Sequence, residues 1–483
     1  MDQSRVPVLE ALAAYRRRGD LNFTPPGHKQ GRGVDPRVLE VLGKDLFRDD
    51  VMVMNGLDDR LQSNGVLEEA QQLMAEAVGA EKAFFSTCGS SLSVKSAMLS
   101  VAGPGEKLLV ARNSHKSVIS ALILSGVEPV WVHGDWDGDL HMSYPPTPQA
   151  VEAAFEAAPD AKGVIVASPV DYGTCGDLAG INEVCRRYDR TFIVDEAWGA
   201  HLPFHEDLPT WGMNAGADLC VTSVHKMGNG LEQSSVFHLQ GNRVDPAVLK
   251  AREDLLGTTS PSTLIYAALD GWRRQMVERG KDLLDRTLEL AESARGEIDK
   301  MHGLWVLSKE NTGAFDVDPL KIVIDVSELG VDGYHASDWL RERCHVNFSL
   351  SDHRRISAEI TVADSEETVG VLLDALRTLS SSAADLPPAA RIDVPEPGEL
   401  ELDVAMLPRD AFFGQVEIVP TGQAVGRIVA EMVTPYPPGA PALCPGERIT
   451  KPVLSYLTSG LEGGMNIPDV SDPSLKTLRV VAE

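Results

Sequence analysis

Hydrophobic residues along this chain follow two different periods, and segments of the two kinds alternate. Short runs that are apolar on both faces predict buried strands, at 107–112, 162–168, 191–197 and 217–223. Segments with apolar residues at helical spacing predict helices, at 66–80, 148–158 and 178–190. Strands and helices that alternate in this way predict an α/β domain with a mostly parallel central sheet that helices cover on both sides.

The pattern changes before and after this region. A short helix at 7–18 opens an arm, and a long helix over roughly 262–301 leads to a smaller α+β domain with strands at 321–329 and 356–363 and a helix at 333–343. A stretch rich in Ser, Ala and Pro reads as a linker. We therefore expect five parts, namely an arm (1–45), a large domain (46–296), a small domain (297–379), a linker (380–399) and a C-terminal domain (400–483).

Composition narrows the class of protein. The chain has 483 residues, more than a single core usually holds, and 71 acidic against 44 basic residues give a net charge of −27. That charge argues against nucleic acid or an anionic membrane as a partner. It is compatible with a cationic ligand, although solubility alone is the stronger explanation. The six cysteines form no CxxC pair, so we expect no metal site and a reducing cytoplasm. We find neither a signal-peptide core nor an apolar run of the ~20 residues that span a bilayer.

The chemistry is concentrated where the predicted strands end, which is where parallel sheets bind ligands. These ends carry His115, Asp195 and the pair His225-Lys226. Pyridoxal 5′-phosphate (PLP) needs a lysine amine to form an imine, a carboxylate at its pyridine nitrogen and a flat group against its ring. Lys226, Asp195 and His115 meet these three needs in turn.

A phosphate site is also predicted. The segment 84–99 passes from a strand through Gly89-Ser90-Ser91 into a helix, where free backbone N–H groups and the helix dipole attract an anion. Ser223 and His225, just before Lys226, complete the predicted site.

Eight sequence motifs in this chain match those of one protein family and occur in the same order. They are PPGHKQGRG (25–33), GLDDR (56–60), STCGSS (86–91), the run 111–132, VDEAWGAHLPF (194–204), SVHKMGNGLEQSSVFH (223–238), TTSPST (258–263) and PYPPGAPALCPGE (435–447). Through these motifs, which span nearly the whole chain, the sequence resembles the Orn/Lys/Arg decarboxylases, PLP enzymes with the aspartate-aminotransferase type of fold.

The resemblance implies roles for individual residues. Cofactor contacts are implied for Gly89, Ser90, Ser91, His115, Asp195, Ala197, Ser223, His225 and Lys226. Lys226 would form the Schiff base, and His115 and Ala197 would pack on opposite faces of the ring. Thr259 and Ser260 would reach the cofactor of a neighbouring subunit, which implies a homodimer or larger assembly with shared active sites.

The surroundings of the substrate depart from the family pattern. Asp171 adds a carboxylate, Trp198 replaces a histidine of short family members, and the run 227–230 is unusual. With Glu447 of the PGE motif, Asp171 and Trp198 are our candidates for contact with the substrate. The expected reaction is α-decarboxylation of arginine, lysine or ornithine to the amine and CO₂, of the kind used in polyamine biosynthesis, with Lys226 or His225 returning a proton to the α-carbon.

Three alternatives remain open at this point. The same apparatus could serve an oxidase or oxidative decarboxylase that uses oxygen. It could serve an aminotransferase, in which Arg354 or Arg355 would hold the α-carboxylate. A regulatory homologue without catalysis is the third alternative, and the retention of Lys226, Asp195 and His115 argues against it.

Overall fold

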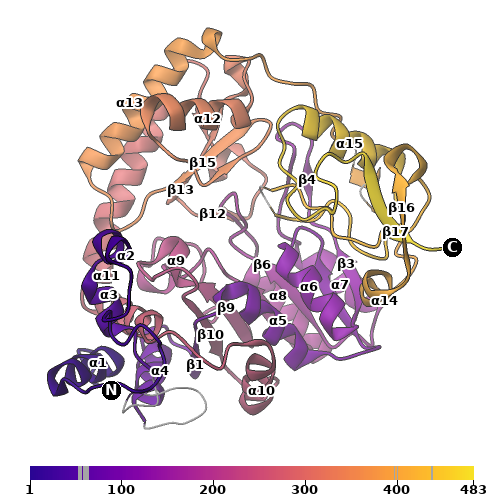
Figure 1. Ribbon diagram of the computed structural model, residues 1–483. Coiled ribbons are helices and arrows are strands. Elements are labelled where there is room, and N and C mark those ends of the chain that lie inside the picture. The colour runs from indigo at the N-terminus through magenta and orange to yellow at the C-terminus, as the bar shows by residue number, and fades with distance from the viewer. Residues whose placement is uncertain (53–56, 58–64, 396, 400, 437–438) are drawn as a thin grey trace. The chain divides into compact units, whose positions relative to one another are not determined.

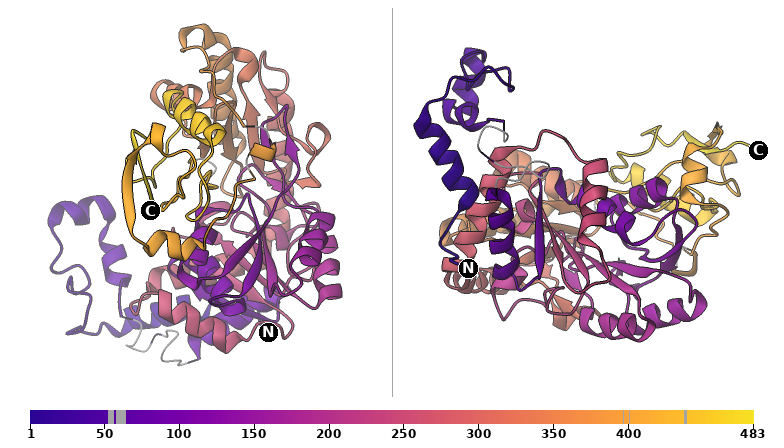
Figure 2. Two further views of the ribbon diagram at one scale, coloured as in Figure 1. Left: turned by 90° about the vertical axis from the view of Figure 1, so that its right-hand side faces the viewer. Right: turned by 90° about the horizontal axis from the view of Figure 1, so that it is seen from below.

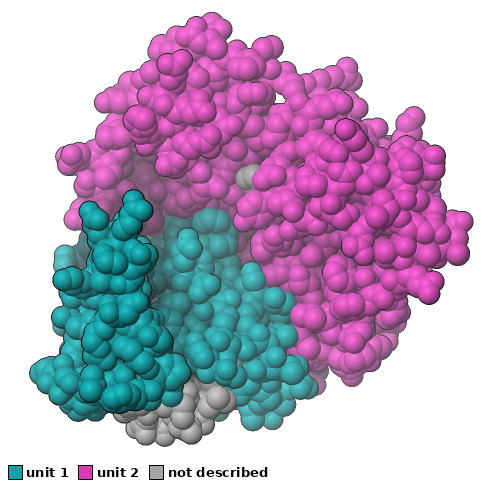
Figure 3. Space-filling view, in the orientation of Figure 1, with its two compact units in different colours: residues 1–97, 196–283 teal, residues 98–195, 284–483 magenta. Residues whose placement is uncertain are grey.

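The computed structural model of the protein describes residues 1–52, 57, 65–395, 397–399, 401–436 and 439–483. The chain divides into two compact units, each made of two separate segments (Figure 3). Unit 1 comprises residues 1–97 and 196–283, and unit 2 comprises residues 98–195 and 284–483. Apart from Leu57, the GLDDR motif lies outside the described residues, as do two prolines of the PYPPG motif.

A seven-stranded sheet with the order β1-β10-β9-β8-β6-β2-β3 carries the predicted strands. In chain order its members are β1 (Lys82–Ser86), β2 (Lys107–Ala111), β3 (Glu128–Val132), β6 (Gly163–Ala167), β8 (Thr191–Asp195), β9 (Leu219–Ser223) and β10 (Ser235–Leu239). In unit 2, β3, β2, β6 and β8 pair in parallel. In unit 1, β9, β10 and β1 pair antiparallel. The predicted α/β class with a mostly parallel central sheet is confirmed.

Each of the four predicted strands is present, one or two residues shorter than its apolar run. Val164, Ile165 and Val166 of β6 are fully buried, and burial of such side chains stabilises the sheet by about 25 cal/mol per Å² of apolar surface. Gly163 is required at the start of β6, since a Cβ there would lie 2.4 Å from the carbonyl oxygen of Thr191 on β8.

Three helices of unit 2 follow strands of its half of the sheet. They are α6 (Lys116–Ser125), α7 (Pro148–Ala157) and α8 (Leu178–Tyr188). Thr147 caps α7 and Asp177 caps α8, each by accepting a backbone N–H of the first turn. Helices α7 and α8 pack side by side (Figure 1).

A four-stranded antiparallel sheet with the order β11-β13-β15-β14 forms the core of the smaller domain. Its elements are β11 (Trp305–Val306), β13 (Lys321–Asp325), β14 (Leu350–Ser351), β15 (Arg355–Glu359), α12 (Gly333–Cys344) and α13 (Glu366–Ser382). Helix α13 continues through Ser382, so the expected linker begins inside a helix. Two short ribbons pair β4 (Trp136–Asp137) with β5 (Met142–Ser143), and β7 (Thr174–Cys175) with β12 (Asp316–Val317).

The C-terminal segment, gold to yellow in Figure 2, contains α14 (Pro408–Phe413), β16 (Val416–Pro420), α15 (Lys451–Glu462) and β17 (Thr477–Val481). Strands β16 and β17 pair antiparallel. The interior of this segment is apolar, with Val429, Val433, Leu443, Leu457 and Leu478 buried in one cluster. This segment therefore has a core of its own within unit 2.

Unit 1 holds most of the remaining helices. They are α1 (Pro7–Arg18), α2 (Pro36–Leu42), α3 (Lys44–Asp49), α4 (Val66–Ala77), α5 (Gly89–Val101), α9 (Val224–Met227), α10 (Pro246–Leu256) and the long α11 (Thr263–Ile298), of which α5 and α11 continue into unit 2. Short 3-10 turns lie at Leu202–Phe204, Lys309–Asn311, Ser327–Leu329, Ala383–Asp385, Pro397–Glu399 and Thr421–Gln423. Among the described residues, we find no helix with the length and apolar character needed to cross a bilayer.

Candidate active site

The predicted lysine, Lys226, lies three residues after the end of strand β9. The chain leaves β9 at Ser223 and enters the short helix α9, which contains His225 and Lys226. The Lys226 ammonium nitrogen lies 4.3 Å from the centre of the Trp198 ring. A cation over an indole face at this distance is an attractive contact. Lys226 and Trp198, both predicted from sequence, therefore lie together in unit 1.

The residues predicted to bind the phosphate lie at and beside the start of α5. Gly89 has φ +76°, a conformation that favours glycine, and its N–H donates to the Gln233 carbonyl at 2.9 Å. The buried Ser223 hydroxyl donates to Ser90 Oγ at 2.6 Å, which joins the end of β9 to the first turn of this 13-residue helix. Ser91 follows on the exposed side of the same turn. Hydroxyls and helix N–H groups together form a donor set that suits a phosphate dianion.

One ring nitrogen of His225 is engaged in a hydrogen bond. Its Nδ1 lies 3.1 Å from the Ser234 carbonyl oxygen, which can only accept, so Nδ1 carries the proton and Nε2 is an acceptor. Burial lowers the pKa of His225, and the charge of Lys226 lowers it further. The imidazole is therefore neutral at pH 7 and able to take a proton at Nε2.

The other candidates of unit 1 differ in exposure. Ala197 is buried. Thr259 and Ser260 lie between α10 and α11 and are exposed. Their predicted contact with a neighbouring subunit stays a prediction.

Unit 2 holds the candidates Asp195 and His115. Asp195 ends β8, pairs in register with Ala167 of β6 and is 6% exposed. His115 caps α6, since its Nδ1 accepts the backbone N–H of Ser117 at 3.2 Å and lies 3.0 Å from the Ser117 hydroxyl. The backbone N–H of Lys116 donates to the Gly439 carbonyl at 2.9 Å, so the C-terminal segment contacts the chain beside His115.

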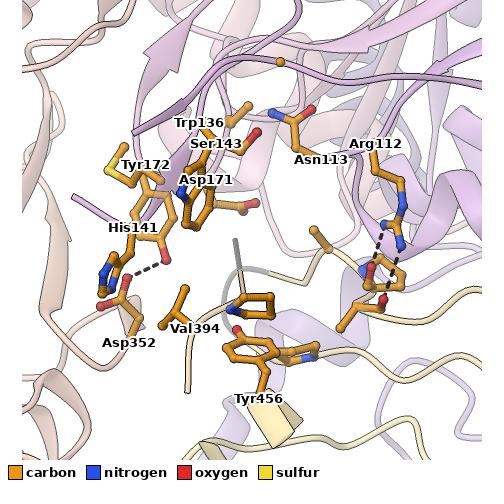
Figure 4. A pocket seen from close by; sticks show the side chains of 18 of the residues that line it. Arg112, Asn113, Trp136, His141, Ser143, Asp171, Tyr172, Asp352, Val394 and Tyr456 are labelled. Carbon is orange, nitrogen blue, oxygen red and sulfur yellow. Dashed lines mark hydrogen bonds between the residues drawn. The ribbon is translucent and has the colours of Figure 1, made fainter. Parts of the chain in front are cut away.

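A pocket of about 450 Å³ lies within unit 2, and its side chains are drawn in Figure 4. Asp171 lines it, together with residues that follow β2 and β6, the ribbon of β4 and β5, the smaller domain and the C-terminal segment. Its polar and aromatic lining comprises Arg112, Asn113, His133, Asp135, Trp136, His141, Ser143, Asp171, Tyr172, Tyr334, Asp352, His353, Glu401 and Tyr456. The pocket therefore combines carboxylates with aromatic rings.

Glu447 is buried beside Arg112. It is 1% exposed, and its Oε2 accepts the Cys444 N–H at 2.7 Å and lies 3.2 Å from the Arg112 guanidinium. Burial raises the pKa of Glu447, although Arg112 opposes that shift. Because Arg112 lines the pocket and Glu447 does not, this geometry favours a role for Glu447 in holding Arg112, and direct contact with substrate stays a prediction.

The arginines considered for an aminotransferase are engaged with carboxylates. Arg354 pairs with Asp325 at 3.1 Å. Arg355 is 1% exposed and pairs with Asp352 at 3.2 Å, with a further hydrogen bond to the Leu140 carbonyl. These contacts give both guanidinium groups a structural role in unit 2.

Several lining residues were not predicted from the sequence. Trp136 and His141 belong to a two-stranded ribbon whose local pattern reads as a loop, and Tyr456 lies far along the chain on α15. Arg112 and Asn113 did have a signal, because both stand inside the 111–132 motif. No local pattern shows that such distant segments line one pocket.

Comparison with known proteins identifies the family. Residues 6–316 match the Orn/Lys/Arg decarboxylase major domain, and residues 399–471 match the C-terminal domain of that family. An arginine decarboxylase of Bacillus anthracis is 39% identical over 100% of this chain and 98% of its own length. That of Bacillus subtilis is 35% identical over 100% and 99%.

A solved structure shares the fold. The constitutive lysine decarboxylase of Escherichia coli superposes with a TM-score of 0.83 at 20% identity, over 100% of this chain and 82% of its own. Both domain models match, and full-length relatives reach 39% identity. The chain therefore belongs to the Orn/Lys/Arg decarboxylase family.

Proposed function

We propose that this protein is a PLP-dependent decarboxylase that converts a basic amino acid, with arginine as the first candidate, to its amine and CO₂. The observation that carries the proposal is the position of Lys226. It follows Ser223, whose hydroxyl donates to Ser90 at the end of β9. Its ammonium nitrogen lies over the Trp198 ring. A reactive amine next to an anion site is what a phosphorylated aldehyde requires.

The described residues fit this cofactor. Ser90, Ser91 and Ser223 would bind its phosphate, with Gly89 allowing the turn into α5, and His225 would do so when Nε2 carries a proton. Asp195 would hold the proton at the pyridine nitrogen, and His115 and Ala197 would pack on the ring. Asp195 is a buried carboxylate and His115 is fixed by Ser117, which supports these roles. When bound, the cofactor supplies an electron sink for the bond that breaks at the α-carbon.

The side chains of the protein supply the proton transfers. Asp195 would keep a proton at the pyridine nitrogen of the bound cofactor. The neutral His225 accepts or passes a proton at Nε2, since its Nδ1 is engaged by Ser234. Lys226 would return a proton to the α-carbon.

Charge and similarity support a basic substrate. The net charge of −27 attracts cations over long range. Two full-length relatives at 35–39% identity are arginine decarboxylases. Asp171, which lines the pocket of unit 2, is our first candidate for the distal cation, and Trp198 and Glu447 remain candidates for contact with substrate.

The remaining proposals concern assembly and compartment. Exposed Thr259 and Ser260 support a homodimer or larger assembly in which each subunit completes its partner's site. The six cysteines, scattered along a long chain, support a reducing cytoplasm. Polyamine synthesis is the proposed context for the amine product.

The test is a spectrum together with a product screen. The purified holoenzyme should show the visible absorbance of an imine-bound cofactor, and Lys226→Ala should abolish it. Each basic amino acid is then supplied, and CO₂ and amine are measured by mass spectrometry. A colourless protein that takes up no PLP, or one that yields no amine from any of them, contradicts the proposal.

A further inference from the structure

The pocket of unit 2 opens at strand ends that already carry candidate catalytic groups. Arg112 and Asn113 follow β2, and Asp171 follows β6. Strand β6 pairs on one side with β2 and on the other with β8, which ends in Asp195. The pocket is thus built on the same edge of this half-sheet as the carboxylate proposed for the cofactor nitrogen.

The electrostatic character of the pocket is negative. Asp135, Asp171 and Glu401 line it. Among the described lining residues Arg112 is the one Lys or Arg, and its guanidinium donates to the carbonyls of Pro441 at 2.6 Å and Ala442 at 3.3 Å and pairs with Glu447. A fourth lining carboxylate, Asp352, is balanced by Arg355. The acidic residues therefore outweigh the cations that face the cavity.

Three histidines add rings to the pocket and no positive charge. Burial lowers the pKa of His133, and Arg112 lowers it further. Burial also lowers the pKa of His141 and of His353, with Arg354 and Arg355 adding to the effect. All three are neutral at pH 7.

Part of the wall is a fixed aromatic stack. The Trp136 and His141 rings lie 6.4 Å apart with an interplanar angle of 8°. His141 in turn stacks on His353 at 5.2 Å, and its Nδ1 lies 2.8 Å from His353 Nε2. Tyr172 is held by a 2.7 Å hydrogen bond from its hydroxyl to Asp352 (Figure 4). These rings form preorganised flat surfaces.

We infer that this pocket binds the distal cation of the substrate and selects a planar guanidinium over a primary ammonium. The inference rests on the proposed function. A guanidinium is planar and weakly hydrated, stacks on aromatic faces and binds a carboxylate through two parallel hydrogen bonds. An ammonium is a compact and strongly hydrated charge, and it gains less from flat rings. Trp136 is then a residue that determines specificity, and Asp171 supplies the charge.

The test compares substrates across matched variants of the holoenzyme. In the wild type, kcat/KM for arginine should exceed that for lysine. Trp136→Leu should lower the arginine value about tenfold through KM and should lower the lysine value much less. Trp339→Leu, on α12 and outside the pocket lining, is the control that removes an indole elsewhere and should keep the ratio.

A second variant and a binding measurement test the inference even if Trp136→Leu fails to fold. Asp171→Asn, which preserves shape, should raise KM for both substrates. Calorimetry should show that guanidinobutylamine binds the wild type more tightly than diaminopentane does, with the difference reduced in Trp136→Leu.

The outcomes separate the two proposals. A wild type that releases no CO₂ from any basic amino acid defeats the proposed function, and calorimetry alone then decides on the pocket. A wild type that prefers lysine, or an arginine-to-lysine ratio that Trp136→Leu leaves unchanged while catalysis persists, overturns the inference.

Discussion

His115 illustrates how one ring is fixed by contacts from distant parts of the chain. Its Nδ1 is engaged by Ser117, and Gly439 packs against its other edge. A Cβ at Gly439 would lie 3.1 Å from His115 Cδ2 and 2.9 Å from the Tyr436 ring, and φ +87° also disfavours any other residue. The C-terminal segment therefore braces the histidine proposed to stack on the cofactor.

Gly439→Ala tests this brace. The added methyl group should displace the His115 ring, lower kcat roughly 10- to 100-fold and change the visible circular dichroism of the bound cofactor. Gly422→Ala is the control in the same segment, because a Cβ there meets no atom within 4 Å. Unchanged dichroism and kcat in Gly439→Ala would show that the ring does not depend on this contact.

Single residues were predictable where their type and their place at a strand end both pointed to chemistry. Lys226 and Ser223 had such signals, and the structure places them beside Trp198 and Ser90. Glu447 was assigned by motif alone, and motif order does not tell which way a buried carboxylate faces. Its engagement by Arg112 depends on packing between segments more than 300 positions apart.

Each of the four strands predicted from apolar runs contains three consecutive apolar residues, such as 192–194 of β8, whereas β10 has no such run and was not predicted. Strand β10 contains Ser235 and His238, so its pattern does not read as a buried strand, yet all five of its residues are buried. Tertiary hydrogen bonds make this possible, since Ser235 donates to the Thr222 carbonyl at 2.8 Å and His238 Nε2 lies 3.1 Å from the Thr222 hydroxyl. Such pairing between strands is not visible in the sequence of either one.

His238 should make the stability of the fold depend on pH. Burial lowers its pKa to about 3 from the ordinary 6.5, so the unfolded chain takes up a proton that the folded chain excludes. This contribution to stability is present above pH 6.5 and is lost as pH falls, by up to about 1.4 kcal/mol per pH unit.

Chemical denaturation of the wild type and His238→Gln at a series of pH values measures this effect. Gln keeps a hydrogen-bonding group but does not titrate, so the free energy of unfolding should fall less steeply toward acid in the variant. If the free energy of unfolding falls equally steeply with pH in both proteins, His238 does not contribute to the pH dependence of stability.

At the scale of the whole molecule, the sequence predicted the class of the fold but not the division into units. Both units are built from separated segments, so no change of composition marks their borders. The oligomeric assembly is also not visible in the hydrophobic pattern of a single chain. Its prediction depends on the roles proposed for Thr259 and Ser260.

Shared active sites predict complementation between two inactive variants. Lys226→Ala lacks the amine, and Ser260→Asp would repel the phosphate of the neighbouring subunit's cofactor. In a mixed dimer, one of the two sites combines an intact Lys226 from one subunit with an intact Ser260 from the other. If equal amounts pair at random, about half of the dimers are mixed, so co-expression should restore about a quarter of wild-type activity. The separately purified variants, mixed without exchange of subunits, are the control. Absence of recovery in isolated mixed dimers would contradict a shared site.

In the proposed reaction, the α-carboxylate leaves as CO₂ and a proton takes its place. The most direct measurement is mass spectrometry of the product formed from arginine in deuterated water, with oxygen uptake recorded in parallel. We expect one CO₂ for each guanidinobutylamine, one deuterium at the carbon that lost the carboxylate, and no oxygen consumed. A keto acid, an aldehyde or stoichiometric oxygen uptake would contradict the account.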